Sequence, residues 1–458
     1  MRLRNHAAAR RLRWPFALAM VLLGVALVPV PRAAGAEESL PRIEGPVTMD
    51  QAVSLALEHS RKIKAAAADE RAMRSMQREA TSGFFPQASA NAYLVNQNMT
   101  PNIYTSAGDT MARNYLFAGT NRTQDLNLSV MWPLFSGGRT YYGYKAARSR
   151  ADAAVLMREG TELDVAMQAR LDYIAVVREQ ENARVTGELL KQTEERLRVS
   201  REELAAGRVA RFNVLRDEAE LANAIQLDTA ARSQAALALI ALKTTLGVDL
   251  ASAIMASEPL QYVPGPVSVE DGIREAMARH PEVRSSEKRA EAAQSDVRSA
   301  YGRYLPELSA TWMYDWQRMR NRGEMTETPE GYSAGLVLTI PLFDGFMREN
   351  AIRTARARQD QAKEQAVLAR QQIAKAVNQA ALILQAAEQI VEASRKGLAQ
   401  AEEQFRIVRE RYASGRGIQV EVLDAQTALT RARFNVVAAL ADHQTARAMW
   451  LQATGRVR

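Results

Sequence analysis

The 458-residue chain contains no cysteine. A disulfide framework, a cysteine nucleophile, a lipid-modified cysteine and a cysteine-ligated zinc or iron–sulfur site are therefore all excluded. Aromatic residues are also scarce, at 6%, whereas 47% of the residues are apolar and 24% are charged. This balance allows a sizeable core and argues against a disordered or collagen-like chain.

Acidic residues are missing from the first 36 residues, which contain six arginines. The remainder of the chain has 54 basic and 52 acidic side chains, so the formal net charge of +8 belongs almost entirely to this leader. A nearly neutral remainder argues against a nucleic-acid partner.

The leader 1–36 has the pattern of a secretory signal peptide. Five arginines precede an apolar stretch from Phe16 to Val30, and an A-x-A sequence then predicts cleavage near Ala36. The alternative is an N-terminal membrane anchor, but the apolar stretch is shorter than the roughly 20 residues of a spanning helix. The sequence therefore predicts export beyond the inner membrane.

Proline is absent from 134–258 and from 342–458. Two uninterrupted helices are predicted there, Arg139 to Ala206 and Met347 to Ser414, each about 100 Å long at a rise of 1.5 Å per residue. Apolar residues recur every seven positions along the second, which predicts a seam packed on a neighbouring helix. These residues are Val377, Leu384, Val391, Leu398, Phe405 and Tyr412.

The chain contains two copies of one unit. Residues 194–215 align with 402–423, with ten of 22 positions identical, and the same offset relates two Pro-Leu-Phe motifs. A shared helical composition would not keep one offset across such motifs. The predicted organisation is a first repeat at 37–257, a proline-rich linker at 258–267 and a second repeat at 268–458.

Each repeat has the same predicted order of helix, two strands and long helical hairpin. The first helices, about 48–82 and 268–302, begin after the N-cap candidates Thr48 and Ser268. Four prolines mark the junctions between strands and helices: Pro86, Pro133, Pro306 and Pro341. The strands are predicted at about 86–98, 123–132, 306–317 and 331–340, and the hairpin tips near 207–215 and 415–423.

Apolar and polar residues alternate along the predicted strands, as in Leu126 to Trp132. This pattern fits a half-buried soluble sheet or strands of an outer-membrane barrel. Export and the flanking long helices favour the membrane. Four strands cannot close a barrel, and open sheet edges are not tolerated in lipid, so several chains must then share one barrel.

Three features resemble the TolC-type outer membrane efflux proteins across nearly the whole mature chain. They are the duplicated SLALEH and EAMARH helices, the PLFSGGR and PLFDGF motifs, and the two tips at Gly207 and Gly415. The resemblance implies a mainly α fold with a small β part. In it, long antiparallel hairpins form a periplasmic α-barrel, and four transmembrane strands per chain contribute to one shared β-barrel.

The resemblance also implies a function. It implies a homotrimeric, passive conduit in outer membrane lipid that extends into the periplasm and serves tripartite efflux or type I secretion. A periplasmic adaptor would bind it, and an inner-membrane pump would supply the energy. The entrance would be closed at the periplasmic tips, where Gly207, Arg208, Gly415 and Gly417 are candidates for adaptor docking.

Carried over residue by residue, the resemblance implies a gate near the second tip. Tyr412 matches the gate tyrosine, and Glu421 and Asp424 match acidic positions that ring the pore. The family's gate arginine falls on Gly417, with Arg416 beside it, and Asn213 stands where an aspartate is usual. Two simpler interpretations remain: Tyr412 continues the helical seam, and the two acids favour the start of a helix.

No enzymatic chemistry is predicted, and no cofactor or metal site. His59, His280 and His443 lie in or at the ends of separate helices, without ligand spacing. An alternative function is a periplasmic adaptor or scaffold with coiled-coil hairpins, although the duplication and the four amphipathic strands disfavour it. An envelope enzyme would need a cluster of catalytic side chains that the sequence does not show. Nothing in the sequence indicates the cargo.

Overall fold

The computed structural model describes residues 40–99, 119–265, 267–321, 324–327 and 331–457. The predicted leader 1–36 lies outside the described residues. From Arg42 onward the chain forms one compact unit.

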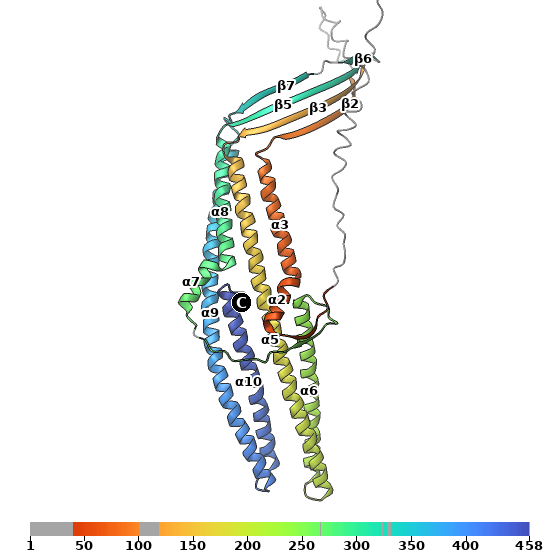
Figure 1. Cartoon of the computed structure of the whole chain (residues 1–458), viewed down its shortest axis with the longest axis vertical. Helices are drawn as coiled ribbons and strands as arrows, with labels where there is room; N and C mark the ends of the chain where they lie inside the picture. Colours follow the sequence, from red (N-terminus) through yellow and green to blue (C-terminus); the bar gives the residue numbers. More distant parts are fainter. Residues whose placement is uncertain (1–39, 100–118, 266, 322–323, 328–330, 458) are drawn as a thin grey trace, which may run out of the picture. The chain divides into compact units, whose positions relative to one another are not determined.

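Two long helices dominate this unit (Figure 1). Helix α5 spans Arg139–Ala205 and helix α9 spans Met347–Ala413, and each is 67 residues long. The returning helices α6 (Arg211–Leu246) and α10 (Gln419–Ala453) complete two antiparallel hairpins. The predicted long helices end one residue later than the observed ones.

The first helix of each repeat is two helices, not one as predicted. They are α2 (Met49–His59) and α3 (Arg61–Ser82), then α7 (Val269–Arg279) and α8 (Pro281–Tyr301), which is followed by a 3₁₀ turn, η2 (Gly302–Tyr304). His280 is extended because the next residue is proline, which disfavours helical geometry before it. Ser60 is extended without a proline signal. The capping box of Thr48 with Gln51 and the Ser268 cap confirm both predicted N-caps.

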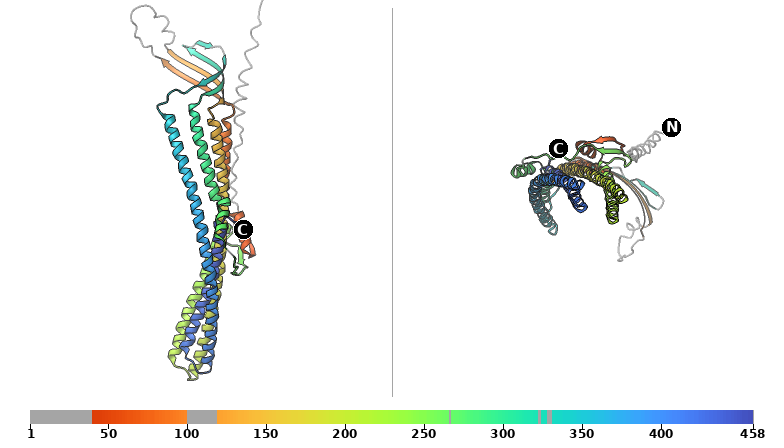
Figure 2. Two further views of the ribbon diagram at one scale, coloured as in Figure 1. Left: turned by 90° about the vertical axis from the view of Figure 1, so that its left-hand side faces the viewer. Right: turned by 90° about the horizontal axis from the view of Figure 1, so that it is seen from below.

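Helices α3, α5, α8 and α9 lie side by side in one layer, and α10 packs on both α5 and α9. Viewed along the helices, the layer is curved into an arc, with α2 and α7 outside it (Figure 2). Helix α6 packs along α5 in the half that contains the tips. No helix in the described ranges is long and apolar enough to cross a membrane.

An antiparallel sheet stands at the end of the layer away from the tips (Figure 1). Its order is β2–β3–β5, and the far edge of β5 pairs with β7 along one half and with β6 along the other. The strands are β2 (Gln87–Met99), β3 (Gly119–Phe135), β5 (Glu307–Asn321), β6 (Glu324–Glu327) and β7 (Gly331–Thr339).

Three strand details differ from the prediction. Strand β3 continues past Pro133, and its register against β5 shifts between Pro133 and Phe135. Proline has no N–H to donate, so the ladder accommodates it with an irregularity there instead of ending. The short strand β6 was not predicted, and β7 stops at Thr339, before Pro341.

The core has two main apolar clusters where the short helices meet the long ones, and a small third cluster between α9 and α10. Helices α2, α5 and α6 share one apolar cluster, and α7, α8, α9 and α10 share another. The Tyr173 hydroxyl in the first cluster donates to the carbonyl of Val47, in a short parallel strand pair of β1 (Glu44–Val47) with β4 (Ala253–Ala256).

The predicted seven-residue seam is buried only along part of α9. Val377, Leu384 and Val391 are 0–5% exposed. Leu398 and Phe405 are half-buried, and Tyr412 is 38% exposed. The seam therefore loosens toward the tip, and Leu398 contributes less packing energy than a fully buried leucine would.

His443 on α10 is fully buried, and neither ring nitrogen has a hydrogen-bond partner among the described residues. Its ring packs 4.9 Å from the ring of Tyr262 in the linker between the repeats. Burial lowers the pKa of His443. The negative charge of Glu388 raises it to a smaller extent, and the positive charge of Arg447 lowers it further. The imidazole is therefore neutral in the folded protein at neutral pH.

We expect stability to fall on acidification because this histidine must be neutral. Its folded pKa is below the unfolded value of 6.5, so the stabilisation is complete above pH 6.5 and is lost as the pH falls toward the folded pKa. One such group contributes a slope of at most about 1.4 kcal/mol per pH unit. His443→Phe should flatten the pH dependence of thermal unfolding between pH 8 and 5, whereas the control His59→Gln should not. An unchanged slope in His443→Phe would contradict the assignment.

Candidate functional site

Each hairpin ends in a tight glycine turn. Gly207 and Gly415 have φ values of +74° and +72°, a region that glycine adopts without strain. The amide of Arg208 donates to the carbonyl of Glu203 at 2.8 Å, and that of Arg416 to Arg411 at 2.9 Å. These bonds satisfy the last carbonyls of α5 and α9, so both turns are fixed by the backbone.

The predicted gate residues lie at this end of the molecule with different exposures. Arg416 and Asp424 are exposed, whereas Asn213 and Glu421 are half-buried. The Glu421 carboxylate has one buried oxygen, Oε2, without a hydrogen-bond partner among the described residues. Burial of a carboxylate oxygen without a hydrogen-bond partner is costly, so Glu421 is held in an unfavourable position within the described chain.

Tyr412 lies at the last turn of α9, close to acidic side chains of the first hairpin. Burial, together with the charges of Glu203 and Asp217, raises the pKa of Tyr412, so its phenol stays protonated. Its hydroxyl forms no hydrogen bond with any described residue. The hydroxyl is therefore a donor without a partner among the described residues, on a side chain that is 38% exposed.

Gly417 lies where a side chain would crowd the backbone at the end of α9. A Cβ atom at this position would lie 3.1 Å from the Tyr412 nitrogen and 3.3 Å from the Arg411 carbonyl carbon. Both neighbours are backbone atoms that cannot rotate away. Any side chain at Gly417 would therefore require the turn to shift slightly.

A buried polar network joins the two hairpins near the tips, and the sequence did not predict it. Asp217 on α6 has an exposure of 0%. Its carboxylate accepts hydrogen bonds from Arg196 Nε at 2.9 Å, from the Ser200 hydroxyl, and from Gln419 Nε2 at 3.0 and 3.1 Å. Arg196 and Ser200 belong to α5, but Gln419 begins α10. One carboxylate thus connects three helices.

The contact between α5 and α10 continues away from the tip. Arg196 also donates to Gln426 Oε1 at 2.5 Å, and Arg433 forms an ion pair with Glu188 at 2.8 Å. Gln419, Gln426 and Arg433 are seven residues apart, so they form one row on the face of α10 that meets α5. This spacing is the signal by which the sequence could have revealed the row.

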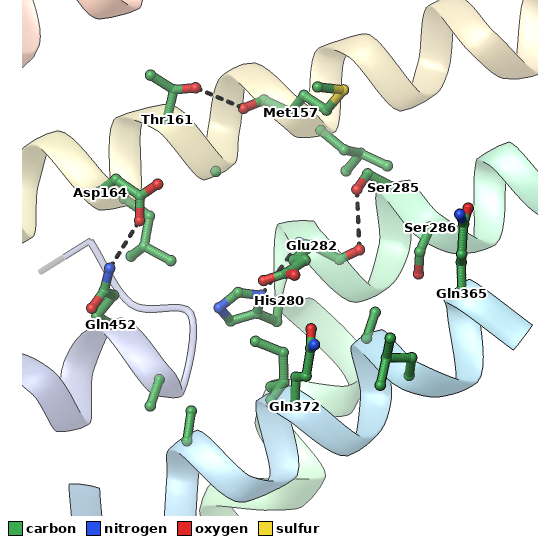
Figure 3. Close-up of a pocket in the computed structure, with 18 of the residues that line it drawn as sticks. Met157, Thr161, Asp164, His280, Glu282, Ser285, Ser286, Gln365, Gln372 and Gln452 are labelled. Carbon is green, nitrogen blue, oxygen red and sulfur yellow. Dashed lines mark hydrogen bonds between the residues drawn. The ribbon is translucent and has the colours of Figure 1, made fainter.

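A cavity of about 780 Å³ lies where the end of α10 meets the start of α8, between α5 and α9 (Figure 3). Its polar side chains form hydrogen bonds that cap one helix and connect two others. His280 Nδ1 accepts from the Glu282 amide at 3.3 Å and caps α8, while Gln452 Nε2 donates to Asp164 at 2.8 Å. No group of acidic or histidine side chains that could hold a metal ion occurs among the described residues. The polar groups of the cavity are therefore used in packing the helices together.

A comparison with known protein families identifies the family of this chain. A family profile described as "Outer membrane efflux protein" matches residues 52–248 and 272–456, one segment in each repeat. The chain belongs to the outer membrane efflux protein family. The match covers most of the chain, so membership accounts for the duplication, the sheet and both hairpins together.

Characterised members of the outer membrane efflux protein family align along most of the chain. Protein CyaE of Bordetella pertussis is 27% identical over 382 residues, which cover 81% of this chain and 79% of CyaE. The outer membrane efflux protein BepC of Brucella suis is 26% identical over 354 residues, which cover 77% of this chain and 75% of BepC.

Solved structures show the same fold. The outer membrane protein VceC of Vibrio cholerae superposes with a TM-score of 0.74 at 19% identity, covering 89% of this chain and 96% of VceC. The open state of the MtrE outer membrane channel of Neisseria gonorrhoeae gives 0.73 at 18% identity, covering 89% of each chain. The mainly α fold with a small sheet, predicted from the sequence, is confirmed.

Proposed function

We propose that this outer membrane efflux protein is one subunit of a homotrimeric, passive channel of a tripartite efflux or type I secretion system. The main support for this proposal comes from the open edges of the sheet. Its outer edges, formed by β2 on one side and by β6 and β7 on the other, have no further strand in the described chain. Open edges are not tolerated in lipid, so neighbouring copies must pair with them to close a twelve-stranded barrel.

Exposed apolar side chains on the two ends of the helical layer support the same assembly. Helix α9 exposes Val367, Leu382 and Ile390, by 45–66%, and α6 exposes Leu237 and Ile240. These helices lie at opposite ends of the arc (Figure 2). A contact between one end and the opposite end of the next copy repeats around an axis and closes a ring.

The periplasmic tips are the proposed gate and docking site. Tyr412, Arg416, Glu421, Asp424 and Asn213 would constrict the passage. The Tyr412 hydroxyl, which has no hydrogen-bond partner among the described residues, suits a contact between copies because Tyr412 is 38% exposed.

A periplasmic adaptor, itself joined to an inner-membrane pump, would dock beside the glycine turns at Gly207, Arg208, Gly415 and Gly417. Phe212 and Ile418, which are 65% and 62% exposed, offer apolar anchors there. Cleavage near Ala36 would release the mature subunit for export. The alternative role as a periplasmic adaptor is disfavoured by family membership.

Detergent-corrected sedimentation and planar-bilayer recording test this function together. We expect the purified protein to sediment as a trimer that dissociates on heating, and to conduct ions when inserted. A monomer in detergent would contradict the shared barrel. A trimer that never conducts, even with the tip network of Asp217 removed, would contradict the conduit.

A further inference from the structure

A groove rich in arginine and tyrosine lies between α8 and α9, where α8 passes into strand β5. Six of the side chains that line it are Arg298, Tyr301, Tyr304, Glu349, Arg353 and Arg356. Three guanidinium groups and one carboxylate leave an excess of two positive charges. The groove is open to solvent within the chain, so its charges are accessible to a ligand.

Two of the three arginines lie against tyrosine rings, and the third contacts only an asparagine. Arg298 lies 5.6 Å from the ring centre of Tyr142, and Arg356 lies 5.4 Å from that of Tyr301, whose hydroxyl it also contacts. Arg353 reaches only Asn350 Oδ1, at 3.5 Å. None of the three forms an ion pair with a described residue, so each keeps most of its capacity to bind an anion.

The one acid in the groove has one oxygen engaged, and its other oxygen, Oε2, is buried without a hydrogen-bond partner among the described residues. Glu349 Oε1 accepts a hydrogen bond from the Tyr304 hydroxyl at 2.8 Å. The ring of Tyr304 also lies under Arg348, at 4.9 Å, whose guanidinium pairs with Asp344. These contacts fix the wall of the groove and leave the other three arginines uncompensated.

The groove opens on the outer face of the curved layer. Glu349, Arg356, Arg370 and Val377 are separated by multiples of seven and so share one face of α9. Val377 on this face packs against α7, near Gly272, and α7 lies outside the arc (Figure 2). The opposite face of the α8–α9 pair has its own arginines, Arg303 and Arg358, in a separate groove with Asp296.

Strongly apolar side chains adjoin the groove on the side of the sheet. Strand β5 begins at Glu307, two residues after Leu305 of the groove lining. In the connection from β7 to α9, Leu342, Phe343 and Phe346 are 89%, 77% and 63% exposed. Aromatic and apolar residues next to cationic ones are typical of the boundary between lipid chains and headgroups.

We propose that this groove binds the phosphate headgroup of an anionic glycerophospholipid in the periplasmic leaflet of the outer membrane. The inference rests on the proposed function, because the strands must lie in that membrane for the groove to stand at headgroup depth. Guanidinium groups pair with phosphate through parallel N–H donors, and the tyrosine rings flank the glycerol region. The acyl chains then extend along the exposed apolar residues.

The test compares two double variants of the intact protein that each remove two arginines from the α8–α9 pair. Arg298→Gln with Arg356→Gln alters the outer face, and Arg303→Gln with Arg358→Gln alters the opposite face. Binding of phosphatidylglycerol, phosphatidylethanolamine and inorganic phosphate is titrated in detergent by native mass spectrometry. We expect the outer-face variant to lose about thirtyfold in affinity for phosphatidylglycerol, given the typical contribution of each arginine near an anionic surface.

The opposite-face variant should keep the wild-type affinity, and wild type should bind phosphatidylglycerol more tightly than phosphatidylethanolamine. Equal losses in both variants, or no lipid preference in wild type, would overturn the proposal. Binding of inorganic phosphate as tightly as the lipid would overturn the assignment to a lipid headgroup. Because sedimentation and conductance are measured separately, a functional trimer without lipid preference rejects this site and leaves the channel function standing.

Discussion

Asp217→Ala is expected to destabilise the tip end of the molecule by about 3–5 kcal/mol, the typical cost of removing one partner of a buried ion pair. Arg196, whose side chain is only 18% exposed, would lose its carboxylate. Gln419 would lose its acceptor on the first hairpin. Chemical denaturation monitored by circular dichroism measures the first effect. Planar-bilayer recording measures the second, as a larger open fraction, because the two hairpins would no longer be joined at that carboxylate.

The neighbouring residue supplies a matched control. Glu218 pairs with Arg201 on the surface, and such exposed pairs contribute at most about 1 kcal/mol. Glu218→Ala should therefore change neither stability nor conductance appreciably. If Asp217→Ala opened the channel no more often than Glu218→Ala does, the network would be structural only, with no part in gating.

Removal of two acids, Glu421→Ala with Asp424→Ala, is expected to abolish most of the channel's preference for cations. In a trimer these positions would place six carboxylates around a narrow passage, where low-dielectric walls strengthen their field on permeating ions. The measurement is the reversal potential in planar bilayers under a salt gradient, which should move toward zero in the double variant. Single-channel conductance at low salt should fall as well, since fewer cations are concentrated at the entrance.

Leu398→Ala separates this electrostatic effect from a general loosening of the rods. Leu398 lies farther from the tip along α9 and is half-buried. Its truncation should therefore lower the free energy of unfolding by less than the roughly 2–5 kcal/mol expected for a buried leucine. Ion selectivity should be unchanged in this variant. An altered selectivity in Leu398→Ala with an unaltered one in the acidic variant would mean that the tips are not the constriction.

The sequence predicts the long elements well because their signals are local. Absence of proline and a sustained apolar period specify α5 and α9 to within one residue at their ends. The break at His280 has a visible cause in Pro281, although the prediction overlooked it. The break at Ser60 has no such cause in the sequence. It occurs where Gly247, at the end of α6, packs against the backbone of His59, a contact that only the folded chain creates.

Local sequence signals of this kind do not predict the buried network around Asp217. Arg196 and Asp217 lie on the two arms of one hairpin, but Gln419 is 202 residues from Asp217. All three are residue types that are common on exposed helix surfaces. Residue-by-residue comparison with the family directed attention to Tyr412 and Glu421 instead. Tyr412 does lie near Asp217, close enough for the aspartate to influence its pKa. The resemblance therefore names residues near this network but not Asp217, the carboxylate that joins its helices.

The unpaired sheet edges have a kinetic consequence for biogenesis. A newly exported subunit would cross the periplasm with β2 and β7 open and with Leu342 and Phe343 in water, which invites non-native strand pairing. In the proposed trimer, productive insertion would require three such subunits to meet, so its rate would rise steeply with their concentration, while misassociation needs only two. Overproduction in excess of periplasmic chaperone capacity would therefore favour aggregates, and slow expression would favour the inserted channel.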